Sequence, residues 1–375
     1  MRTTTAPVER RQADSRSSLD RLPSRLRLGT RRSALARTQS QTVADQLAAA
    51  LTRARPDRPI AVELVEITTR GDVTKASLST LGGTGVFVSA LRDALLDGKI
   101  DFAVHSLKDL PTAPADGLLL AAVPVRADSR DALIARDGLT ISELPLASTV
   151  GTGSPRRAAQ LRALGLGLEV VDTRGNVDTR LKLASDGVLD AVVLAQAGLD
   201  RLGRADEITQ LFDPLLMLPA PGQGALAVEC RIEDAALIAA LALLDDAQSR
   251  ASVLAERALL ARLEAGCAAP VGALAEVVEG QNGLELSLSA VVGSIDGLIS
   301  IRRSATSVLP GLTSTGREAG LPLAADDAAA AHQLGVSLAE QMLEDGAAEL
   351  LPEPTAMPAS QPTSGTAAMA REGDL

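Results

Sequence analysis

The sequence predicts an α/β fold in which two lobes of alternating strands and helices are followed by a smaller C-terminal α+β domain. From residue 26 to residue 228, short β-branched or apolar runs alternate with segments whose apolar residues recur at helical spacing. The alternation runs twice and restarts near Asp131. From Ala247 a long helix rich in Ala, Leu and Arg and then hairpin-like strands replace it. Alternating strands and helices indicate two parallel α/β units, and the change of composition indicates a further domain.

The elements of the first unit follow from local signals. A short strand at 26–30 precedes a helix that Ser33 caps. Further strands are expected at 60–67, 100–104 and 118–123, and a second helix at 88–95 ends before Gly98.

The second unit and the C-terminal part are justified in the same way. Strands are expected at 131–135, 149–150, 168–171 and 191–195, and helices at 154–164 and 177–185. A proline- and glycine-rich run, 218–224, interrupts the alternation before an apolar strand at 225–228. The last part contains a helix at 247–264, strands between 284 and 301, and a helix at 328–344.

These elements divide the chain into three domains between two tails. The first lobe takes residues 26–124 together with 225–242, and the second lobe takes residues 125–224. Residues 243–351 form the C-terminal domain, which contains an expected flexible insertion at 304–326. Residues 1–25 and the segment 352–375, rich in Pro, Ala, Ser and Thr, are expected to be disordered tails.

The composition excludes several classes of function. The formal net charge is -10, and the chain contains three Phe but no Tyr or Trp, so neither a nucleic-acid backbone nor base stacking is favoured. Two Cys, Cys230 and Cys267, are too few for a disulfide scaffold, and no Cys/His cluster has the spacing of a metal site. No apolar run is long enough to span a membrane, and the arginine-containing N-terminus lacks the apolar core of a signal peptide. A cytosolic, reducing location is the expectation.

Arginines gather at turns of this acidic chain. In Gly151–Arg157, Ser154 is an N-cap, Pro155 stands at the first helical position, and Arg156 and Arg157 lie on the same turn. Free N–H groups, the helix dipole and two guanidiniums favour a carboxylate or phosphate ligand there. Further arginines fall on loops or first turns at corresponding ends of predicted strands: Arg31, Arg32, Arg174 and Arg180. The pattern predicts a ligand with several carboxylates.

Two further segments hold groups that can do chemistry. Cys267 lies in a loop of small residues after a helix, which fits either an accessible thiol or a cysteine that merely packs. Asp109 follows a buried strand within His105–Asp109, where a carboxylate can stabilise a developing cation or simply cap a turn. A nucleophilic pair of Cys267 and His105 is a further alternative that the residue types allow.

Eight motifs in order make the chain resemble the porphobilinogen deaminase (hydroxymethylbilane synthase) family. The resemblance runs from about residue 26 to 350 and is carried by residues 27–36, 69–72, 103–111, 151–157, 174–177, 197–203, 221–224 and 264–267. It implies two lobes like those of periplasmic binding proteins, with the active site between them, and a third domain. It also implies a transferase that joins four porphobilinogen molecules head to tail, releases ammonia and yields hydroxymethylbilane for haem and porphyrin biosynthesis.

The resemblance also implies a cofactor and roles for individual residues. A dipyrromethane cofactor is joined by a thioether to the position of Cys267, and the catalytic carboxylate falls on Asp109. Asp72 and Phe87 match positions beside the site, where Phe87 can belong to a lid. The positions that match cofactor- or substrate-binding groups are Arg31, Ser33, Ser106, Lys108, Thr152, Ser154, Arg156, Arg157, Arg174, Arg180, Arg201 and Gln223. The implied protein is a monomer that passes its product to the next tetrapyrrole enzyme.

The chain departs from the family pattern in the segment before Phe87. Thr80 and Thr84 stand where lysines are frequent, and Lys75 is the nearby cation, which puts an anion-binding role of this segment in doubt. Two alternatives to the transferase remain at this point. A non-catalytic anion-binding protein of the same two-lobed fold needs the arginines but neither Cys267 nor Asp109. A cysteine-dependent hydrolase needs a histidine such as His105 beside Cys267.

Overall fold

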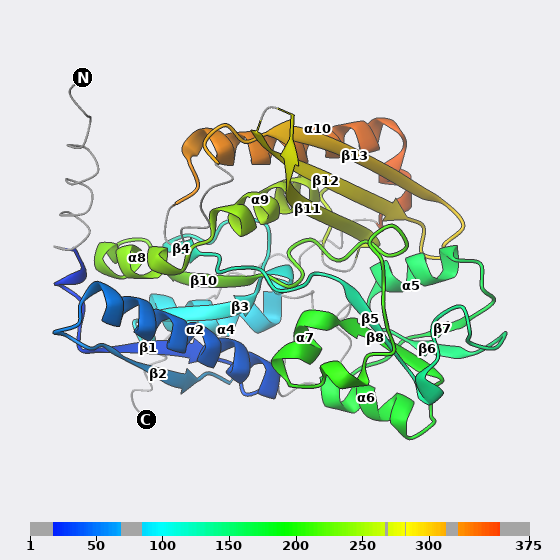
Figure 1. Cartoon of the computed structure of the whole chain (residues 1–375), viewed down its shortest axis with the longest axis horizontal. Coiled ribbons are helices and arrows are strands. Elements are labelled where there is room, and N and C mark those ends of the chain that lie inside the picture. The colour runs from blue at the N-terminus through cyan, green and yellow to red at the C-terminus, as the bar shows by residue number, and fades with distance from the viewer. Residues whose placement is uncertain (1–17, 69–84, 267–268, 282, 313–321, 353–375) are drawn as a thin grey trace, which may run out of the picture.

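Two α/β lobes lie side by side beneath a third domain in the computed structural model of the chain (Figure 1). It describes residues 18–68, 85–266, 269–281, 283–312 and 322–352, with the backbone alone at 85–87. Three sheets organise these residues: one of five strands in each lobe and one of three strands in the C-terminal domain. The predicted fold class is confirmed.

The sheet of the first lobe has the order β2-β1-β3-β10-β4. Its strands are β1 (Arg25–Thr30), β2 (Ala61–Glu66), β3 (Phe102–Ser106), β4 (Leu118–Ala122) and β10 (Leu226–Arg231). Its helices are α2 (Ala34–Ala54), α4 (Gly85–Leu96) and α8 (Ala235–Leu241), with short 3-10 turns η1 (Leu107–Asp109) and η4 (Ala242–Leu244). The Ser33 hydroxyl accepts a hydrogen bond from the backbone N–H of Ala36, so the predicted cap of α2 is present.

The sheet of the second lobe has the order β7-β6-β8-β5-β9. Its strands are β5 (Asp131–Ala135), β6 (Thr149–Gly151), β7 (Glu169–Val171), β8 (Ala191–Ala195) and β9 (Gln210–Leu211). Its helices are α5 (Pro155–Ala163), α6 (Val177–Ser185) and α7 (Gln196–Arg201), with 3-10 turns η2 (Arg136–Gly138) and η3 (Ala205–Glu207).

The two sheets repeat one strand order, but neither is wholly parallel. β1 is parallel to β2 and β3, and β6 is parallel to β7 and β8. The fourth strand of each sheet, β10 in one and β5 in the other, is antiparallel to both of its neighbours. The prediction of parallel units is therefore wrong for one position in each lobe. The chain leaves the first sheet after β4, and β10 returns to it from the second lobe, so β10 enters in the opposite direction.

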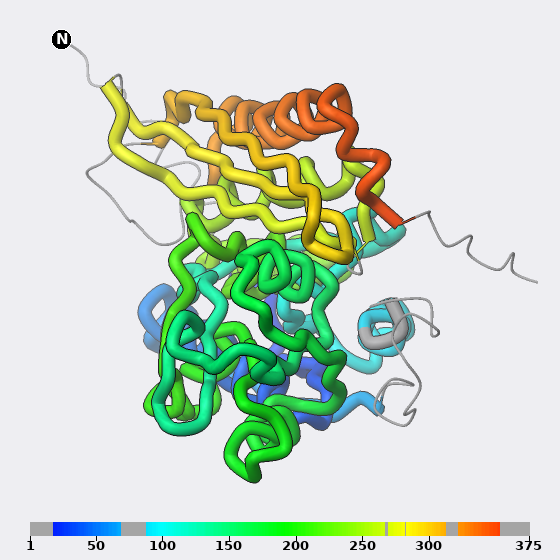
Figure 2. The backbone as a smooth tube through the Cα atoms, turned by 90° about the vertical axis from the view of Figure 1, so that its right-hand side faces the viewer, coloured from blue at the N-terminus to red at the C-terminus, as the bar shows by residue number. Residues whose placement is uncertain are grey.

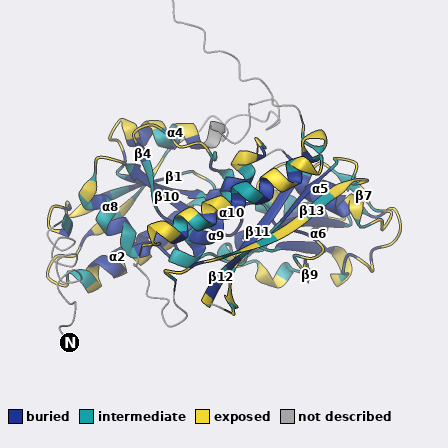
Figure 3. Ribbon diagram, turned by 90° about the horizontal axis from the view of Figure 1, so that it is seen from above, coloured by how far each residue is buried: buried dark blue, intermediate teal, exposed yellow. Residues whose placement is uncertain are grey.

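The C-terminal domain is an antiparallel sheet, β11-β12-β13, packed on two helices. Its elements are α9 (Ala247–Arg262), β11 (Val271–Gly280), β12 (Gly283–Gly293), β13 (Ser300–Val308), α10 (Ala325–Glu344) and η5 (Ala347–Leu350). Figure 2 shows this domain stacked on the two lobes, and Figure 3 shows the exposed outer stripe of α10. Sheet membership supports the proposed domain limits, which remain a prediction.

Two predicted irregular segments include ordered structure. Residues 304–308 of the expected 304–326 insertion continue β13, where Ser304 Oγ lies 2.8 Å from Ser289 Oγ on β12. Small polar residues there read as a linker but pair well on the exposed face of a hairpin. The described part of the expected 1–25 tail also packs on the first lobe, with Leu19 4% and Leu22 2% exposed.

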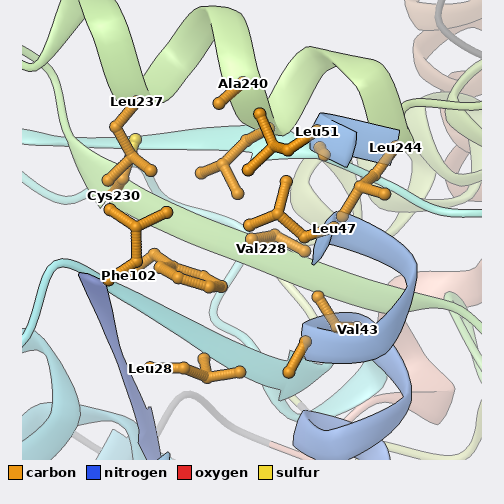
Figure 4. Packing of buried hydrophobic residues seen from close by; sticks show 14 of the residues in the cluster. Leu28, Val43, Leu47, Leu51, Phe102, Val228, Cys230, Leu237, Ala240 and Leu244 are labelled. Carbon is orange, nitrogen blue, oxygen red and sulfur yellow. The ribbon is translucent and has the colours of Figure 1, made fainter. Parts of the chain in front are cut away.

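The core of the first lobe lies between its sheet and helices α2 and α8. Figure 4 shows Phe102 and Val228 of the sheet packed against Val43 and Leu47 of α2. Cys230 lies in the same cluster and is fully buried, as the sequence predicts. Packing in this core fixes the position of the sheet. It therefore also fixes where the strands end, and the functional side chains extend from those ends.

Candidate active site

A cavity of about 100 Å³ lies between the two lobes. Residues of α2 and of the β3 end form one wall, residues of α5, α6, β8 and α7 form another, and Gly222–Ala225 closes the space between them. Six predicted site residues line it: Ser106, Lys108, Arg157, Arg180, Arg201 and Gln223.

The strands position these side chains. β3 ends at Ser106, and the next turn, η1, presents Lys108. β6 ends at Gly151, and α5 begins one short turn later with Ser154 as its N-cap and Pro155 in its first turn, as predicted. Because parallel strands end at the same edge of a sheet, ligand-binding loops collect there.

The cavity is cationic. Lys108, Arg157 and Arg180 line it together with Arg201, and none of the described lining residues is acidic. Burial lowers the pKa of Arg180, and the charges of Arg157 and Arg174 lower it further. Arg180 Nε is buried and has no hydrogen-bond partner within the described part of the chain. An anionic group in the cavity would satisfy this atom and relieve the repulsion between like charges.

Lys108 is the group in this cavity that titrates nearest to neutrality. Burial, followed by the charge of Arg157, lowers its pKa to about 8, although Asp109 and Asp131 act in the opposite direction. Its ammonium donates to Gln223 Oε1 over 3.3 Å. Gln39, which sequence reasoning missed, donates through Nε2 to Ser106 Oγ at 2.9 Å.

Asp131 organises the arginine pair and is also absent from the predicted site residues. Its carboxylate, 0% exposed, accepts from Arg156 Nη1 at 2.7 Å, Arg157 Nε at 2.9 Å and Gln223 Nε2 at 2.8 Å. Burial alone would raise the pKa of Asp131, but the two guanidiniums outweigh it and hold that pKa well below its usual range. The signal for Asp131 in the sequence is a charged residue at the start of an otherwise apolar strand.

This arrangement differs between the two arginines, and a ligand-binding role of Arg156 stays a prediction. Arg156 is buried and also donates to the carbonyl of Leu218 at 2.5 Å, and it does not line the cavity. Arg157 does line it, while Nη1 donates to the carbonyl of Val193 at 3.0 Å. Asp131 therefore holds Arg156 inside the second lobe and leaves one face of Arg157 toward the cavity.

Other predicted residues lie at the strand ends but not on the cavity wall. The Ser154 hydroxyl accepts from the N–H of Arg157 at 3.4 Å, and Ser33 caps α2 in the same way. Buried Thr152 accepts from the N–H of Ser154 at 3.2 Å. Exposed Arg174 pairs with Asp172, and half-buried Arg31 follows β1.

Asp109 is half-buried and shares the η1 turn with Lys108. It is not among the residues that line the cavity, although its negative charge reaches the Lys108 ammonium. Cys267, Asp72, Thr80, Thr84, Lys75 and the side chain of Phe87 lie outside the described residues. The C-terminal end of α9 leads directly into the loop that carries Cys267.

His105 has a structural partner that argues against the hydrolase alternative. Its Nε2 lies 3.1 Å from Glu229 Oε2, and both side chains are buried. Arg92 donates to the other carboxylate oxygen of Glu229 at 2.8 Å. Burial would raise the pKa of Glu229, but bonds to His105 and Arg92 lower it to about 2. A histidine held in this way is engaged with Glu229 in the interior of the first lobe.

A second, larger cavity of about 400 Å³ lies at the junction of the lobes with the C-terminal domain. None of the predicted site residues lines it. Its two arginines already have carboxylate partners: Arg126 binds Glu256, and Arg130 binds Asp128. We therefore assign the function to the smaller, cationic cavity. Within the described residues, no group of three or more His, Cys, Asp or Glu side chains could hold a metal ion, and no helix has the length and apolarity to cross a membrane.

The fold and this cavity define the class of the protein: a two-lobed α/β protein with a cationic cavity between its lobes. Two family models identify it further: "Porphobilinogen deaminase, dipyromethane cofactor binding domain" matches residues 26–239, and "Porphobilinogen deaminase, C-terminal domain" matches residues 251–344. The chain belongs to the porphobilinogen deaminase family.

Curated proteins with similar sequences belong to the same family. The porphobilinogen deaminase of Nocardia farcinica is 53% identical over 351 residues, which cover 92% of each chain. Porphobilinogen deaminase 1 of Streptomyces coelicolor is 54% identical, over 88% of this chain and 98% of the relative. The porphobilinogen deaminase of Mycobacterium tuberculosis is 54% identical, over 87% of this chain and 98% of the relative.

Proposed function

We propose that this chain carries out its family's reaction in the cavity between the lobes, with Asp109 as the catalytic carboxylate and Cys267 as the cofactor attachment point. The reaction joins four porphobilinogen molecules head to tail, releases ammonia and forms hydroxymethylbilane in tetrapyrrole biosynthesis. The observation that carries the proposal is the cluster of four cationic side chains around a cavity without described acidic walls.

The cations suit the substrate. Each porphobilinogen brings one acetate and one propionate, so a growing chain accumulates carboxylates. Lys108, Arg157 and Arg180, together with Arg201, are the cavity groups that we assign to them. Each charge-assisted hydrogen bond contributes about 1.5–3 kcal/mol. Because several cations share the ligand, removing one should slow particular additions and leave the fold intact.

Asp109 is assigned to the charge that develops during ammonia loss. When the C–N bond of porphobilinogen breaks, the electron pair leaves with nitrogen and the remaining azafulvene is cationic. A carboxylate beside the pyrrole N–H accepts its hydrogen bond and stabilises that charge. The η1 turn holds Asp109 next to Lys108, at the edge of the sheet where the cavity lies.

The described residues fit a dipyrromethane cofactor, which supplies the pyrrole that the first porphobilinogen is joined to. Arg180 Nε, buried and unpartnered among the described residues, is suited to bind a cofactor or substrate carboxylate. Of the two cysteines, Cys230 lies in the apolar core, and burial raises the pKa of its thiol to about 12. A thiol kept protonated and inaccessible is no nucleophile, which leaves Cys267 for the thioether.

We further propose that the protein acts as a monomer in the cytosol and passes its product to the next tetrapyrrole enzyme. The family's usual behaviour supports these points, and two cysteines without a disulfide framework suit a reducing compartment.

Intact mass of the protein from a porphobilinogen-producing host tests the proposal. We expect a mass excess of two linked pyrrole units in the wild type and in Cys230→Ser, and none in Cys267→Ser. An unmodified wild type without turnover of porphobilinogen would favour the anion-binding alternative. An excess that persists in Cys267→Ser but disappears in Cys230→Ser would reject the attachment point alone.

A further inference from the structure

Helix α9 presents one stripe of side chains to the first lobe. Arg250, Val253 and Arg257 recur at helical spacing on it, so they share a face. Arg250 donates to the carbonyls of Leu120 and Ala121 at 3.5 and 3.1 Å. Figure 1 shows α9 between the C-terminal sheet and the first lobe. The helix therefore fastens the third domain to the first.

The last residue of this stripe binds the segment directly after Asp109. Arg257 Nη1 donates to the carbonyl of Leu110 at 2.9 Å, and Nη2 donates to the carbonyl of Pro111 at 2.7 Å. One turn earlier on α9, Val253 packs in the same apolar cluster as Leu107 and Leu110. The η1 turn is thus in contact with α9 through both packing and a two-pronged guanidinium.

The turn is also fixed from the side of the cavity. The N–H of Leu107 donates to the carbonyl of Ala225 at 3.0 Å, and the N–H of Leu110 closes the turn on Leu107 at 3.0 Å. Gly222 has φ +75°, and a Cβ there would lie 3.3 Å from the backbone nitrogen of Lys108. The segment Gly222–Ala225 contacts the η1 turn on one side. Arg257 binds the end of this turn on the other side.

We propose that Arg257 is a positioning residue, which sets the Lys108–Asp109 turn relative to the helix that leads to Cys267. This rests on the roles proposed above for Asp109 and Cys267. α9 ends at Arg262, shortly before the Cys267 loop, so one rigid helix holds the carboxylate turn with Arg257 and carries the attachment point at its end. The Lys108–Asp109 turn thereby keeps a fixed position relative to α9, and a reaction between bound groups depends on such positioning.

Arg257→Met tests this proposal, with Arg250→Met as the matched control. Arg250 joins the same helix to the same lobe through two carbonyls and also binds Asp245 at 2.6 Å, so its loss costs stability as well, but it lies away from the turn. We expect Arg257→Met to keep the cofactor mass and to lower kcat by about 10- to 100-fold with KM for porphobilinogen within about twofold, the effect of misplacing a reacting group. Arg250→Met should lower Tm comparably and leave kcat near wild type. Arg257→Lys should recover part of kcat, because an ammonium can reach one of the two carbonyls.

Equal kcat values in Arg257→Met and Arg250→Met would overturn the proposal, as would a rise in KM without loss of kcat. If Arg257→Met does not fold, Arg257→Lys decides: a lower kcat at unchanged Tm supports the positioning role, and an unchanged kcat rejects it. A wild type that does not turn over porphobilinogen would instead reject the function proposed above, so the two failures are distinguishable.

Discussion

Lys108 gives the cavity a charge that depends on pH near neutrality. Its pKa is lowered to about 8 by burial and by Arg157, so the ammonium is still protonated at pH 7. A bound carboxylate favours the charged form and raises that pKa again. Binding of an anion to Lys108 is therefore strongest below pH 8 and weakens as the pH rises through 8.

The pH dependence of KM for porphobilinogen tests this role of Lys108. Between pH 7 and pH 9 we expect KM of the wild type to rise by about 10-fold, which corresponds to the lower end of one charge-assisted hydrogen bond. Lys108→Arg is the control, because a guanidinium stays protonated and its KM should change little over that range. Parallel profiles for the two proteins would show that the Lys108 ammonium does not bind the substrate.

Asp131 compensates two buried guanidiniums, so its removal should cost much of the protein's stability. Asp131→Asn leaves Arg156 and Arg157 without a counter-charge, and we expect the free energy of unfolding in urea to fall by about 3–5 kcal/mol. Asp128→Asn, which breaks the partly exposed pair with Arg130, should cost at most about 1 kcal/mol. Similar losses in the two variants would contradict the compensating role of Asp131.

The acid dependence follows from the same group. The pKa of Asp131 is lower in the folded chain than its ordinary value of 3.8, so the unfolded chain binds its proton first. Its stabilising contribution is complete at neutral pH and is lost as the pH falls below that ordinary value. The Asp131→Asn protein should lack this part of the loss of stability in acid.

Among the elements, the described N-terminal segment contributes to the core of the first lobe, although its sequence does not predict this. Leu19 and Leu22 are buried in the core of the first lobe, and Arg55 donates to the carbonyl of Leu19. Arg58 donates to the carbonyls of Asp20 and Leu22 at 2.7 and 3.1 Å. Two leucines among many charged residues do not produce a periodic pattern, so the segment resembles a tail.

Truncation tests this element. Removing residues 1–23 exposes the leucine-binding surface, and we expect the free energy of unfolding to fall by about 3–6 kcal/mol, since each of the two buried leucines contributes about 1.5–3 kcal/mol. Removing residues 1–17 keeps Leu19 and Leu22 and serves as the control, with stability expected to match the full chain. A truncated protein lacking 1–23 that unfolds like the control would show that this packing is dispensable.

Most elements of the two lobes could be predicted from their sequence because each leaves a local signal. Ser33 and Ser154 cap their helices as predicted, and the strands fall within a few residues of the apolar runs. Strand direction leaves no such signal: β10 and β5 are largely apolar, like the neighbouring strands β3 and β8 that run in the opposite direction. β11 lies outside the predicted strands because its first half, Val271–Ala275, does not alternate between apolar and polar residues and includes a glycine and two alanines.

The sequence predicts which cationic residues form the candidate site, but it does not predict how these residues are arranged in space. Lys108, Arg157 and Arg180 could be assigned to strand ends, and the structure brings them to one cavity. The helix N-terminus predicts that Arg156 faces a ligand, but its position on the first turn does not show that Asp131, from another strand, pairs with it. Internal pairing of this kind depends on long-range packing, which composition and spacing do not encode.

At the scale of the whole molecule, the carboxylate of Glu256 binds the two segments that connect the lobes and also the sheet of the C-terminal domain. Glu256 of α9 is 0% exposed and accepts from Arg126 Nη1 at 2.6 Å and Nη2 at 3.1 Å. It also accepts from the N–H of Gly222 at 2.5 Å and the N–H of Ala275 at 2.8 Å. Arg126 and Gly222 belong to the two segments that connect the lobes, and Ala275 belongs to the C-terminal sheet.

The connecting segments themselves lie in direct contact. Gly224 has φ +86°, and a Cβ there would lie 2.4 Å from the carbonyl oxygen of Ala127. Only glycine allows this approach. Because Glu256 binds both segments at this junction, its charge helps to set how the lobes meet around the cavity.

Glu256→Gln should therefore destabilise the whole molecule. An amide presents one acceptor oxygen to donors that a carboxylate serves with two, and Arg126 loses its buried counter-charge, so we expect a loss of about 3–5 kcal/mol in the free energy of unfolding. Glu340→Gln on α10 is the control for an exposed pair, because Glu340 binds exposed Arg262 of α9 and should contribute at most about 1 kcal/mol. Urea unfolding of both variants, with Arg126→Met and the Arg126→Met/Glu256→Gln double variant, measures the coupling. If the two single losses simply add in the double variant, Arg126 and Glu256 act independently and the junction must be held by its backbone contacts.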